Sequence, residues 1–304
     1  MPVLIIKQEG HSKHWILLIV LGIAWGGSFS IAKIALENGY HPLGINWWVS
    51  AISTVLLMFY ILVRQKKLPI DRNHIYIYVV CGALGTAIPG VLYFFSLKHI
   101  SPGIVAIMMA NVPIMTFVVA TIRGIEKKSF FRVLGVLLGV ASILLLIVPE
   151  ESLPERSAIP WVIVMAFAAA CYAAENIVLA RRVPPTADTY VVLFGMSVAS
   201  TLMMTPFLLL SDAFVPISTP LQRSDLAIVG LSALNVLCYG SFVLLVLRAG
   251  PVFASQTAYI ITISGVLWGI LIFNDQHSVW VWVSLIVMLI ALSLVTPKIS
   301  NLSN

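Results

Sequence analysis

The residue of this sequence whose type and place could do chemistry is Glu175, in the segment CYAAENIVLARR that runs from Cys171 to Arg182. The chain before it is apolar back to Ile159, so the carboxylate falls inside a hydrophobic run. A charge in such a run is costly, which makes a function or a partner the default expectation. Three roles are open: a catalytic acid, a group that binds cargo or carries protons, and an ion-pair partner of Arg181, Arg182 or a polar neighbour.

Catalysis lacks the other groups it would need. The six histidines (11, 14, 41, 74, 99 and 277) fall in loops or at the ends of hydrophobic runs, and so does every Asp. There is no HExxH motif, no pair of buried carboxylates and no CxxC spacing among Cys81, Cys171 and Cys238. We therefore expect neither an enzyme nor a metal site, and no catalytic residue, metal ligand or cofactor is assigned.

The composition indicates whether this chain lies in water or in a membrane. Of 304 residues, 60% are hydrophobic and 10% are charged, with a mean hydropathy of +1.01. Soluble domains are roughly 25% charged and about 45–50% apolar, so the sequence predicts an integral membrane protein whose main partner is the lipid bilayer. The net charge of +6 does not indicate nucleic-acid binding, because the basic residues are spread over short loops rather than gathered in one patch.

The elements that must position Glu175 are membrane-spanning helices, each of about 20 apolar residues. The hydrophobic runs predict ten, at residues 15–36, 43–63, 74–97, 102–122, 130–149, 160–181, 188–210, 225–248, 252–272 and 278–296. Pro89 and Pro113 fall inside two of the runs, where each removes a backbone donor and can kink the helix.

Lys and Arg residues set the orientation of these spans. With a cytoplasmic N-terminus, all 18 except Lys33, Lys98, Arg156 and Arg223 fall in cytoplasmic segments. This asymmetry follows the positive-inside rule. It predicts a multi-pass protein of the plasma or inner membrane, with both termini in the cytoplasm.

The second half of the chain resembles the first. The segment ISPGIVAIMMANVPIMTFVVATIRGIEKKS (100–129) matches AGPVFASQTAYIITISGVLWGILIFNDQHS (249–278), with Glu126 on Asp275 at a shift of 149 residues. A shift of 148 places Lys33 on Arg181, and YFFSLKHISP aligns with FVLLVLRAGP to within one residue. Five spans are an odd number, so the halves must insert in opposite orientations, as in many transporters.

These features resemble the drug/metabolite transporter superfamily, specifically its EamA-type ten-helix members. The resemblance is carried by AWGGSFSIAK (24–33), by the ISPG…ANVP…E run through Glu126, and by ENIVLARR before Pro184. It implies two inverted five-helix repeats around a central cavity, here residues 15–149 and 160–297 with an outer linker at 150–159. It also implies that spans 1, 3, 4, 6, 8 and 9 surround the cavity, that spans 5 and 10 support it, and that the cargo is a small metabolite. Many relatives carry an Arg in span 2, where this chain has Trp47 and Trp48.

Polar and aromatic residues on the spans expected at the cavity form the candidate substrate site. Buried polar groups in spans tend to face the bundle interior, although any one of them can serve only interhelical bonding. The candidates are Trp25, Ser28, Tyr93, Asn111, Tyr172, Glu175, Asn176, Asn235, Tyr239, Gln256 and Tyr259.

Lys33, Glu175 and Arg182 are candidates for gating or coupling. At 1.5 Å per residue, Lys33 and Glu175 differ by about 19 Å in depth, so they cannot pair in a straight bundle. We expect Lys33 to extend outward to the membrane surface. The GVLLG spacing at 135–139 predicts close helix packing, inside the chain or across a homodimer.

The sequence thus predicts a secondary transporter that exports a small zwitterionic or amphipathic metabolite, such as an amino acid or derivative, by alternating access. A facilitative importer and a drug or toxic-compound efflux carrier are the alternatives. A channel or an intramembrane enzyme fits less well, because inverted halves favour alternating access. Proton coupling through Glu175 and simple downhill flux are both open, as are a monomer and a homodimer.

Overall fold

The computed structural model describes residues 11–126, 129–150, 153, 155–184 and 186–296. Parts of the expected linker, the last residue of the second expected repeat, and Lys7, Lys127, Lys128 and Lys298 lie outside these residues. The elements are α1 (His11–Ala35), α2 (Pro42–Val63), α3 (Arg72–Gly82), η2 (Ala83–Ala87), α4 (Ile88–His99), α5 (Pro102–Met109), α6 (Asn111–Ile122), α7 (Phe130–Ile147), η3 (Arg156–Ala158), α8 (Ile159–Arg182), α9 (Thr189–Leu210), α10 (Arg223–Ala249), α11 (Pro251–Ser255), α12 (Thr257–Phe273) and α13 (Val279–Val295).

The described residues form only helices and the links between them, and most of these helices are spans. Nine are long and apolar enough to cross a membrane when continuous runs are joined, and α13 adds a shorter apolar helix of 17 residues. Lipid offers no hydrogen-bond partner to a peptide group, so a helix that satisfies its own backbone is the element such runs adopt. The predicted all-α membrane fold is confirmed.

Three spans are interrupted, two of them beside a proline. The α3–α4 span contains the π-helix η2, in which the Ile88 amide bonds the Ala83 carbonyl, one residue further back than in an α-helix. Pro89 follows directly and supplies no N–H, which favours this local widening. Similarly, α5 gives way to α6 at Ala110, three residues before Pro113. The break between α11 and α12, at Gln256, has no such proline.

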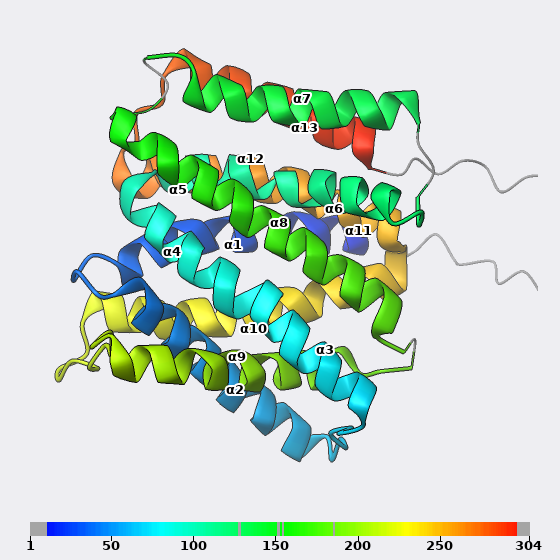
Figure 1. The fold of residues 1–304 in the computed structure, drawn as a ribbon, viewed down its shortest axis with the longest axis vertical. Coiled ribbons are helices and arrows are strands. Elements are labelled where there is room, and N and C mark those ends of the chain that lie inside the picture. The colour runs from blue at the N-terminus through cyan, green and yellow to red at the C-terminus, as the bar shows by residue number, and fades with distance from the viewer. Residues whose placement is uncertain (1–10, 127–128, 151–152, 154, 185, 297–304) are drawn as a thin grey trace, which may run out of the picture.

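The helices α7 and α13 form a pair that lies beside the rest of the bundle (Figure 1). The hydroxyl groups of Ser142 and Ser284 bond each other at 2.8 Å and also bond each other's backbone carbonyls. A Cβ on Gly135 would lie 2.8 Å from the Ala291 carbonyl oxygen, so glycine permits this close approach. The GVLLG spacing is therefore used for packing inside the chain, at least through Gly135.

The helix contacts follow a repeating rule around the bundle. Helix α1 packs on α10 and α12, while α8 packs on α4 and α6. Likewise α2 packs on α10, and α3 packs on α9. Each span has a counterpart in the other half of the chain, five spans further along or back. If both helices of any pair named above are replaced by their counterparts, the result is another of the pairs named above. The three remaining major pairings, α7 with α13, α2 with α9 and α5 with α12, map onto themselves.

The two ends of the bundle differ in packing. We call the end that carries Lys33, Leu97 and Asp275 the closed end, and the end that carries Arg181, Val246 and Glu126 the open end. At the closed end, one continuous hydrophobic core joins α1, α4, α5 and α8. At the open end, a cluster around Leu18 and Leu245 is separate from a second cluster around Ile77 and Met196.

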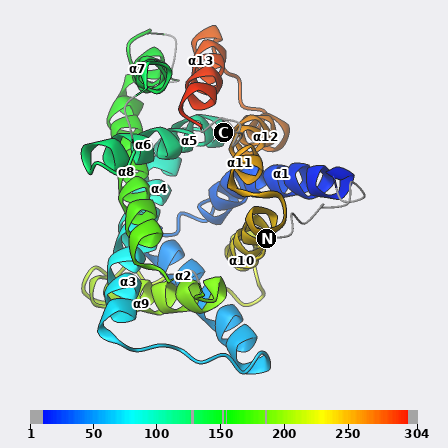
Figure 2. The ribbon, with the colours of Figure 1, turned by 90° about the vertical axis from the view of Figure 1, so that its right-hand side faces the viewer.

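The separation at the open end runs between two groups of helices. Among the described residues, α3, α6 and α8 form no extensive packing with α1, α10, α11 or α12. Figure 2 looks at this end and shows α8 and α3 on one side, with α1, α10 and α11 on the other. Helix α1 begins and helix α13 ends at this same end of the bundle (Figures 1 and 2).

Candidate functional site

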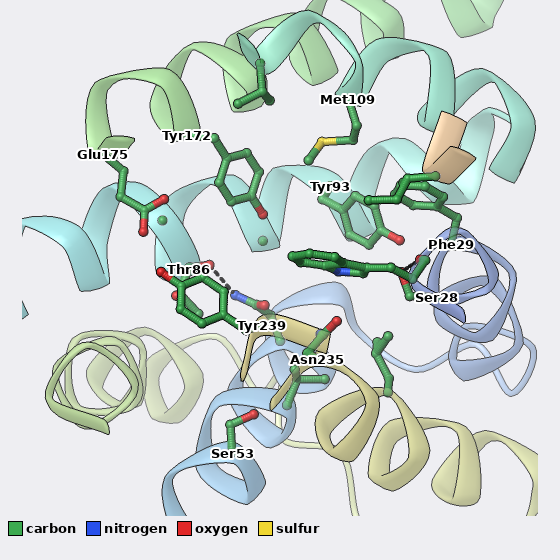
Figure 3. A pocket seen from close by; sticks show the side chains of 18 of the residues that line it. Ser28, Phe29, Ser53, Thr86, Tyr93, Met109, Tyr172, Glu175, Asn235 and Tyr239 are labelled. Atoms are coloured by element: carbon green, nitrogen blue, oxygen red, sulfur yellow. Dashed lines mark hydrogen bonds between the residues drawn. The ribbon is translucent and has the colours of Figure 1, made fainter. Parts of the chain in front are cut away.

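A cavity of about 440 Å³ lies between the two groups of helices, near the middle of the bundle. Its size falls within the usual range for small-molecule sites, about 300–1,000 Å³. Eight of the eleven candidate residues line it. They are Trp25, Ser28, Tyr93, Tyr172, Glu175, Asn176, Asn235 and Tyr239. The side chains of Tyr93, Tyr172 and Tyr239 converge on the same space (Figure 3).

Three candidates lie away from the cavity lining. Asn111 is 2% exposed at the start of α6, and a Cβ on Gly139 of α7 would lie 3.4 Å from its amide oxygen. Gln256 and Tyr259 also lie outside the lining, whereas Ala258, Ile261 and Thr262 of the same region belong to it. Successive helical residues are rotated by about 100°, so the face that presents those three turns Tyr259 toward α13.

Glu175 is the one charged residue among the lining residues that the structure describes. Its carboxylate lies against the π-helix: a Cβ on Gly85 would stand 2.1–2.4 Å from the carboxylate atoms, so a larger residue there would have to displace the carboxylate. No hydrogen bond or ion pair joins Glu175 to another described residue. The ion-pair role that the sequence left open is therefore not filled by Arg181, by Arg182 or by a polar neighbour in this structure.

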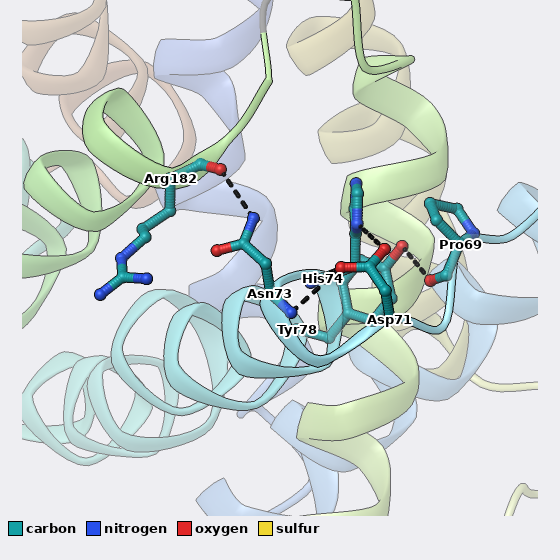
Figure 4. A network of polar contacts seen from close by, with 6 residues as sticks. All are labelled: Pro69, Asp71, Asn73, His74, Tyr78 and Arg182. Carbon is teal, nitrogen blue, oxygen red and sulfur yellow. Dashed lines mark hydrogen bonds and ion pairs between the residues drawn. The ribbon is translucent and has the colours of Figure 1, made fainter.

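Arg182 is held away from Glu175 by helix α3. Its guanidinium lies 5.1 Å from the centre of the Tyr76 ring, and its backbone carbonyl accepts a hydrogen bond from the Asn73 amide at 3.1 Å. Asn73 follows Asp71, the N-cap of α3, which is also bonded to His74 (Figure 4). The pKa of the Asp71 carboxyl is lowered chiefly by that His74 hydrogen bond. Arg182 thus fixes α8 to α3 at the open end.

Lys33 takes part in the closure of the opposite end. Its amine donates a hydrogen bond to the Leu97 carbonyl at the end of α4, instead of extending to water as we expected. The last turn of a helix leaves carbonyls without intrahelical partners, which makes them good acceptors for a nearby amine. Because it bonds Leu97, Lys33 ties α1 to α4. Lys33 and Glu175 form no ion pair, as expected from their difference in depth.

Asp275 and His277 complete the polar group at the closed end. Burial raises the pKa of Asp275, while the nearby positive charges of His277 and Lys33 act in the opposite direction. Burial also lowers the pKa of His277. Asp275 Oδ2, His277 Nε2 and Ser278 Oγ are buried without a hydrogen-bond partner.

The cavity also has two walls that the sequence reading missed. Asn46, Ser50 and Ser53 of α2 line it, as do Leu193, Met196 and Ser197 of α9. The Asn46 amide donates to the carbonyls of Thr86 and Ala87 at 3.0 and 3.3 Å, in the π-helix that Pro89 disturbs. The signal was present in the spacing of Asn46, Ser50 and Ser53, which places three polar groups on one helical face.

The cavity lining offers groups that can bind a small ligand. Within the described part of the chain, no group of three or more His, Cys, Asp or Glu side chains could hold a metal ion. Glu175 has no second acid beside it in the described lining, which otherwise consists of aromatic, amide, hydroxyl and apolar groups. The arrangement offers one negative charge and an amphipathic wall.

Comparison with known proteins gives a consistent result. The model of the EamA-like transporter family matches residues 13–148 and again residues 160–296. An inner membrane transporter of Escherichia coli K12, YedA, whose function is uncharacterized, is 24% identical over 284 residues, which are 92% of this chain and 89% of that protein. The transporter YoaV of Bacillus subtilis, also uncharacterized, is 22% identical over 47% of this chain and 48% of its own.

Two further matches are a plant protein and a solved structure, and the solved structure supports the fold. A WAT1-related protein of Arabidopsis thaliana, At1g11460, is 25% identical over 42% of this chain and 39% of its own. A crystal structure matches with a TM-score of 0.62 at 16% identity, over 94% of this chain and 97% of that one.

Proposed function

The chain belongs to the EamA-like transporter family, and on that premise we propose that it is a secondary transporter that exports a small amphipathic or zwitterionic metabolite by alternating access. The observation that carries the proposal is the carboxylate of Glu175, which lies in the wall of a cavity inside the bundle and has no hydrogen-bond or ion-pair partner among the described residues. A charged side chain at the centre of a membrane helix costs about 2.5–3.5 kcal/mol on insertion scales. A buried carboxylate without a partner among the described residues is suited to the reversible binding of a ligand.

The natural complement of this site is a cationic amine. A primary ammonium group can donate three hydrogen bonds, and its attraction to Glu175 is strengthened where water is scarce. Trp25, Tyr172 and Tyr239 line the same cavity and can hold an apolar or aromatic body, with cation–π attraction as a further contribution.

A carboxylate on the substrate would find weaker support. The described lining contains no Lys, Arg or His, so such a group would depend on amides and hydroxyls such as Asn235. We therefore rank amines and amino-acid derivatives with a blocked carboxylate ahead of free amino acids.

Alternating access is supported by the exchange pattern of helix contacts and by the difference between the two ends. A chain built from two inverted halves, 15–149 and 160–297, can reach a mirrored state by exchanging the conformations of its halves. The positive-inside rule assigns the open end and both termini to the cytoplasm. In this state the cavity would load from the cytoplasm, which favours export.

Glu175 also bears on whether transport is coupled to protons. Glu175 is the group in the described lining that could carry a proton, so proton coupling, where it exists, would pass through it. Downhill flux without coupling is the alternative.

The packing of Gly135 inside the chain provides a use for the GVLLG spacing that needs no second copy of the chain.

A drug or toxic-compound efflux carrier is the second candidate function. It is favoured by the aromatic side chains in the cavity wall, which suit apolar cations of varied shape. A facilitative importer would use the same site with the opposite net flux.

Flux measurements in proteoliposomes would test the proposal. Tyramine, tyrosine methyl ester and tyrosine share one ring and amine but differ in their carboxylate, and each would be assayed with and without a pH gradient. We expect the first two to be transported faster, and Glu175→Gln to reduce their flux by about 10- to 100-fold, as expected for loss of a charged hydrogen bond. The matched control is Glu150→Gln, because Glu150 is exposed and paired only with Arg156. Wild-type flux in folded Glu175→Gln at every pH would contradict the proposal.

A further inference from the structure

The closed end is held by a defined set of groups. Lys33 on α1 bonds the Leu97 carbonyl at the end of α4, and Asp275 is close enough for the two charges to interact. Helix α1 also packs on α4 and α5 at this end. The lysine, the helix-end carbonyl and the carboxylate form what we call the closed-end lock.

The repeat supplies an equivalent for each member of this lock. The shift of 148 residues takes Lys33 to Arg181, and the shift of 149 takes Leu97 to Val246 and Asp275 back to Glu126. All three equivalents lie at the open end, on α8, on the last turns of α10 and just after α6. The chemical type is kept at each position: a cation, a carbonyl near a helix C-terminus and a carboxylate.

The equivalents are not assembled in this structure. Arg181 is exposed and forms no hydrogen bond or ion pair with another described residue. Glu126 is bonded to Arg132 at 2.9 Å at the surface. Helix α8 has no extensive packing on α10 in the described chain, although α1 does pack on α4, which is the equivalent pair.

We propose that Arg181, the carbonyls of the last turn of α10 around Val246, and Glu126 form a second lock, which closes the open end when the closed end opens. The inference rests on the proposed function, since it requires alternating access by two inverted halves. A guanidinium at the C-terminus of α10 is favoured by the helix dipole. The Val246 carbonyl accepts the Gly250 N–H at 2.9 Å, and its second lone pair can accept a hydrogen bond from the guanidinium. The lock gives each state one set of cation-to-carbonyl bonds, so the two states can be close in free energy.

The adjacent Arg182 separates this proposal from a simple count of positive charges. It has the same charge, lies at the same end and follows Arg181 directly. However, the Tyr76 ring and the Asn73 amide hold it on α3, and Figure 4 shows the contact with Asn73. We therefore assign the gating role that the sequence suggested for Arg182 to Arg181 instead. A role in membrane orientation alone would make the two arginines equivalent.

The test is the labelling of a cavity cysteine from each side of the membrane. Asn235→Cys would be the reporter, in a chain whose buried Cys81, Cys171 and Cys238 are replaced by Ala. A membrane-impermeant maleimide would be applied to right-side-out and inside-out vesicles. This readout needs no substrate, so it does not depend on the choice of metabolite.

We expect Arg181→Met to reduce labelling from the closed end, relative to labelling from the open end, by about 10- to 100-fold. Arg182→Met should change the ratio less than about twofold, and adding Lys33→Met to Arg181→Met should return it toward the wild-type value. Equal ratios for the two arginine variants would overturn the lock while leaving alternating access intact. A reporter that is never labelled from the closed end, in wild type or in Lys33→Met, would instead contradict the proposed transport mechanism itself.

Discussion

The closed end and the open end are built from equivalent segments of a repeated sequence, yet only one of them is packed. At the closed end, Lys33 bonds the end of α4 inside a continuous core. At the open end, the equivalent Arg181 is exposed and two smaller clusters are separate. The difference teaches that closure is not a property of the sequence of either end alone. Under the proposed mechanism, closure is a choice between two arrangements, of which this structure is one.

The largest effect is expected from breaking the closed-end lock. Lys33→Met keeps the length and apolar stem of the side chain but removes the amine that bonds the Leu97 carbonyl. A hydrogen bond from a charged group is worth about 1.5–3 kcal/mol, so the balance between the two states should shift about 10- to 100-fold toward the one that is open at the Lys33 end.

Closed-end labelling of the cavity reporter measures this shift. Lys98→Met is the matched control, because Lys98 lies at the same end but is exposed and forms no hydrogen bond or ion pair with a described residue. An unchanged labelling ratio in Lys33→Met would show that the lysine does not hold this end closed.

A smaller effect is expected between the ends, where the π-helix adjoins the cavity. The methyl group of Gly85→Ala would stand 2.1–2.4 Å from the Glu175 carboxylate and must displace it. Transport of an amine should fall about 10-fold, since a misplaced binding group loses most of a charged hydrogen bond, while labelling from both ends should persist.

Gly230→Ala is the control for this substitution. A Cβ at Gly230 would meet no atom within 4 Å, so its flux should match the wild type. Equal flux in both glycine variants would mean that the position of the Glu175 carboxylate does not matter for transport.

Part of this account was open to prediction from the sequence. The spans and the expected difference in depth between Glu175 and Lys33 follow from hydrophobic run lengths and from helical rise. The cavity position of Glu175 was implied by the family resemblance. Asn46 was missed because span 2 was judged by an absent Arg rather than by its polar face. Asn111, Gln256 and Tyr259 lie outside the cavity lining of this structure. Rotation about a helix axis is sensitive to the local breaks at Ala110 and Gln256, which the sequence pattern does not reveal.

The difference between the two ends could not be predicted in that way. The repeat places equivalent groups at both ends, so the pattern of residues is compatible with closure at either one. Which end closes depends on how the two groups of helices pack in three dimensions.

The smallest effect is expected from contacts that stay on one side of the opening. Asp188 caps α9 through the Tyr190 amide at 3.0 Å and pairs with Lys66 at 3.0 Å, and Lys66 lies just after α2. Burial alone would raise the pKa of Asp188, but these hydrogen bonds outweigh it and hold the pKa below its ordinary value. The stabilisation is therefore complete above the unfolded-state pKa, about 3.9, and is lost as the pH falls through the lower native value.

Thermal unfolding in detergent at several pH values checks this prediction. Asp188→Ala should lose the cap, about 0.5–2 kcal/mol, at neutral pH and progressively less in acid. Asp188→Asn keeps a good cap and should lose much less, and neither variant should change the labelling ratio of the two ends. A marked change in that ratio would show that the α2–α9 contact takes part in the opening.

The central claim is that the two ends open in alternation, and distance measurements between spin labels test it most directly. One pair would bridge the open end, at Ala180→Cys on α8 and Leu247→Cys on α10. The other would bridge the closed end, at Lys98→Cys in the last turn of α4 and Gln276→Cys before α13. Both pairs would be placed in the chain without native cysteines, in lipid nanodiscs. The account predicts two populations at each end, with Lys33→Met shortening the distance across the open end as it lengthens the other. Distances that change at one end only, or that lengthen at both ends together, would contradict it.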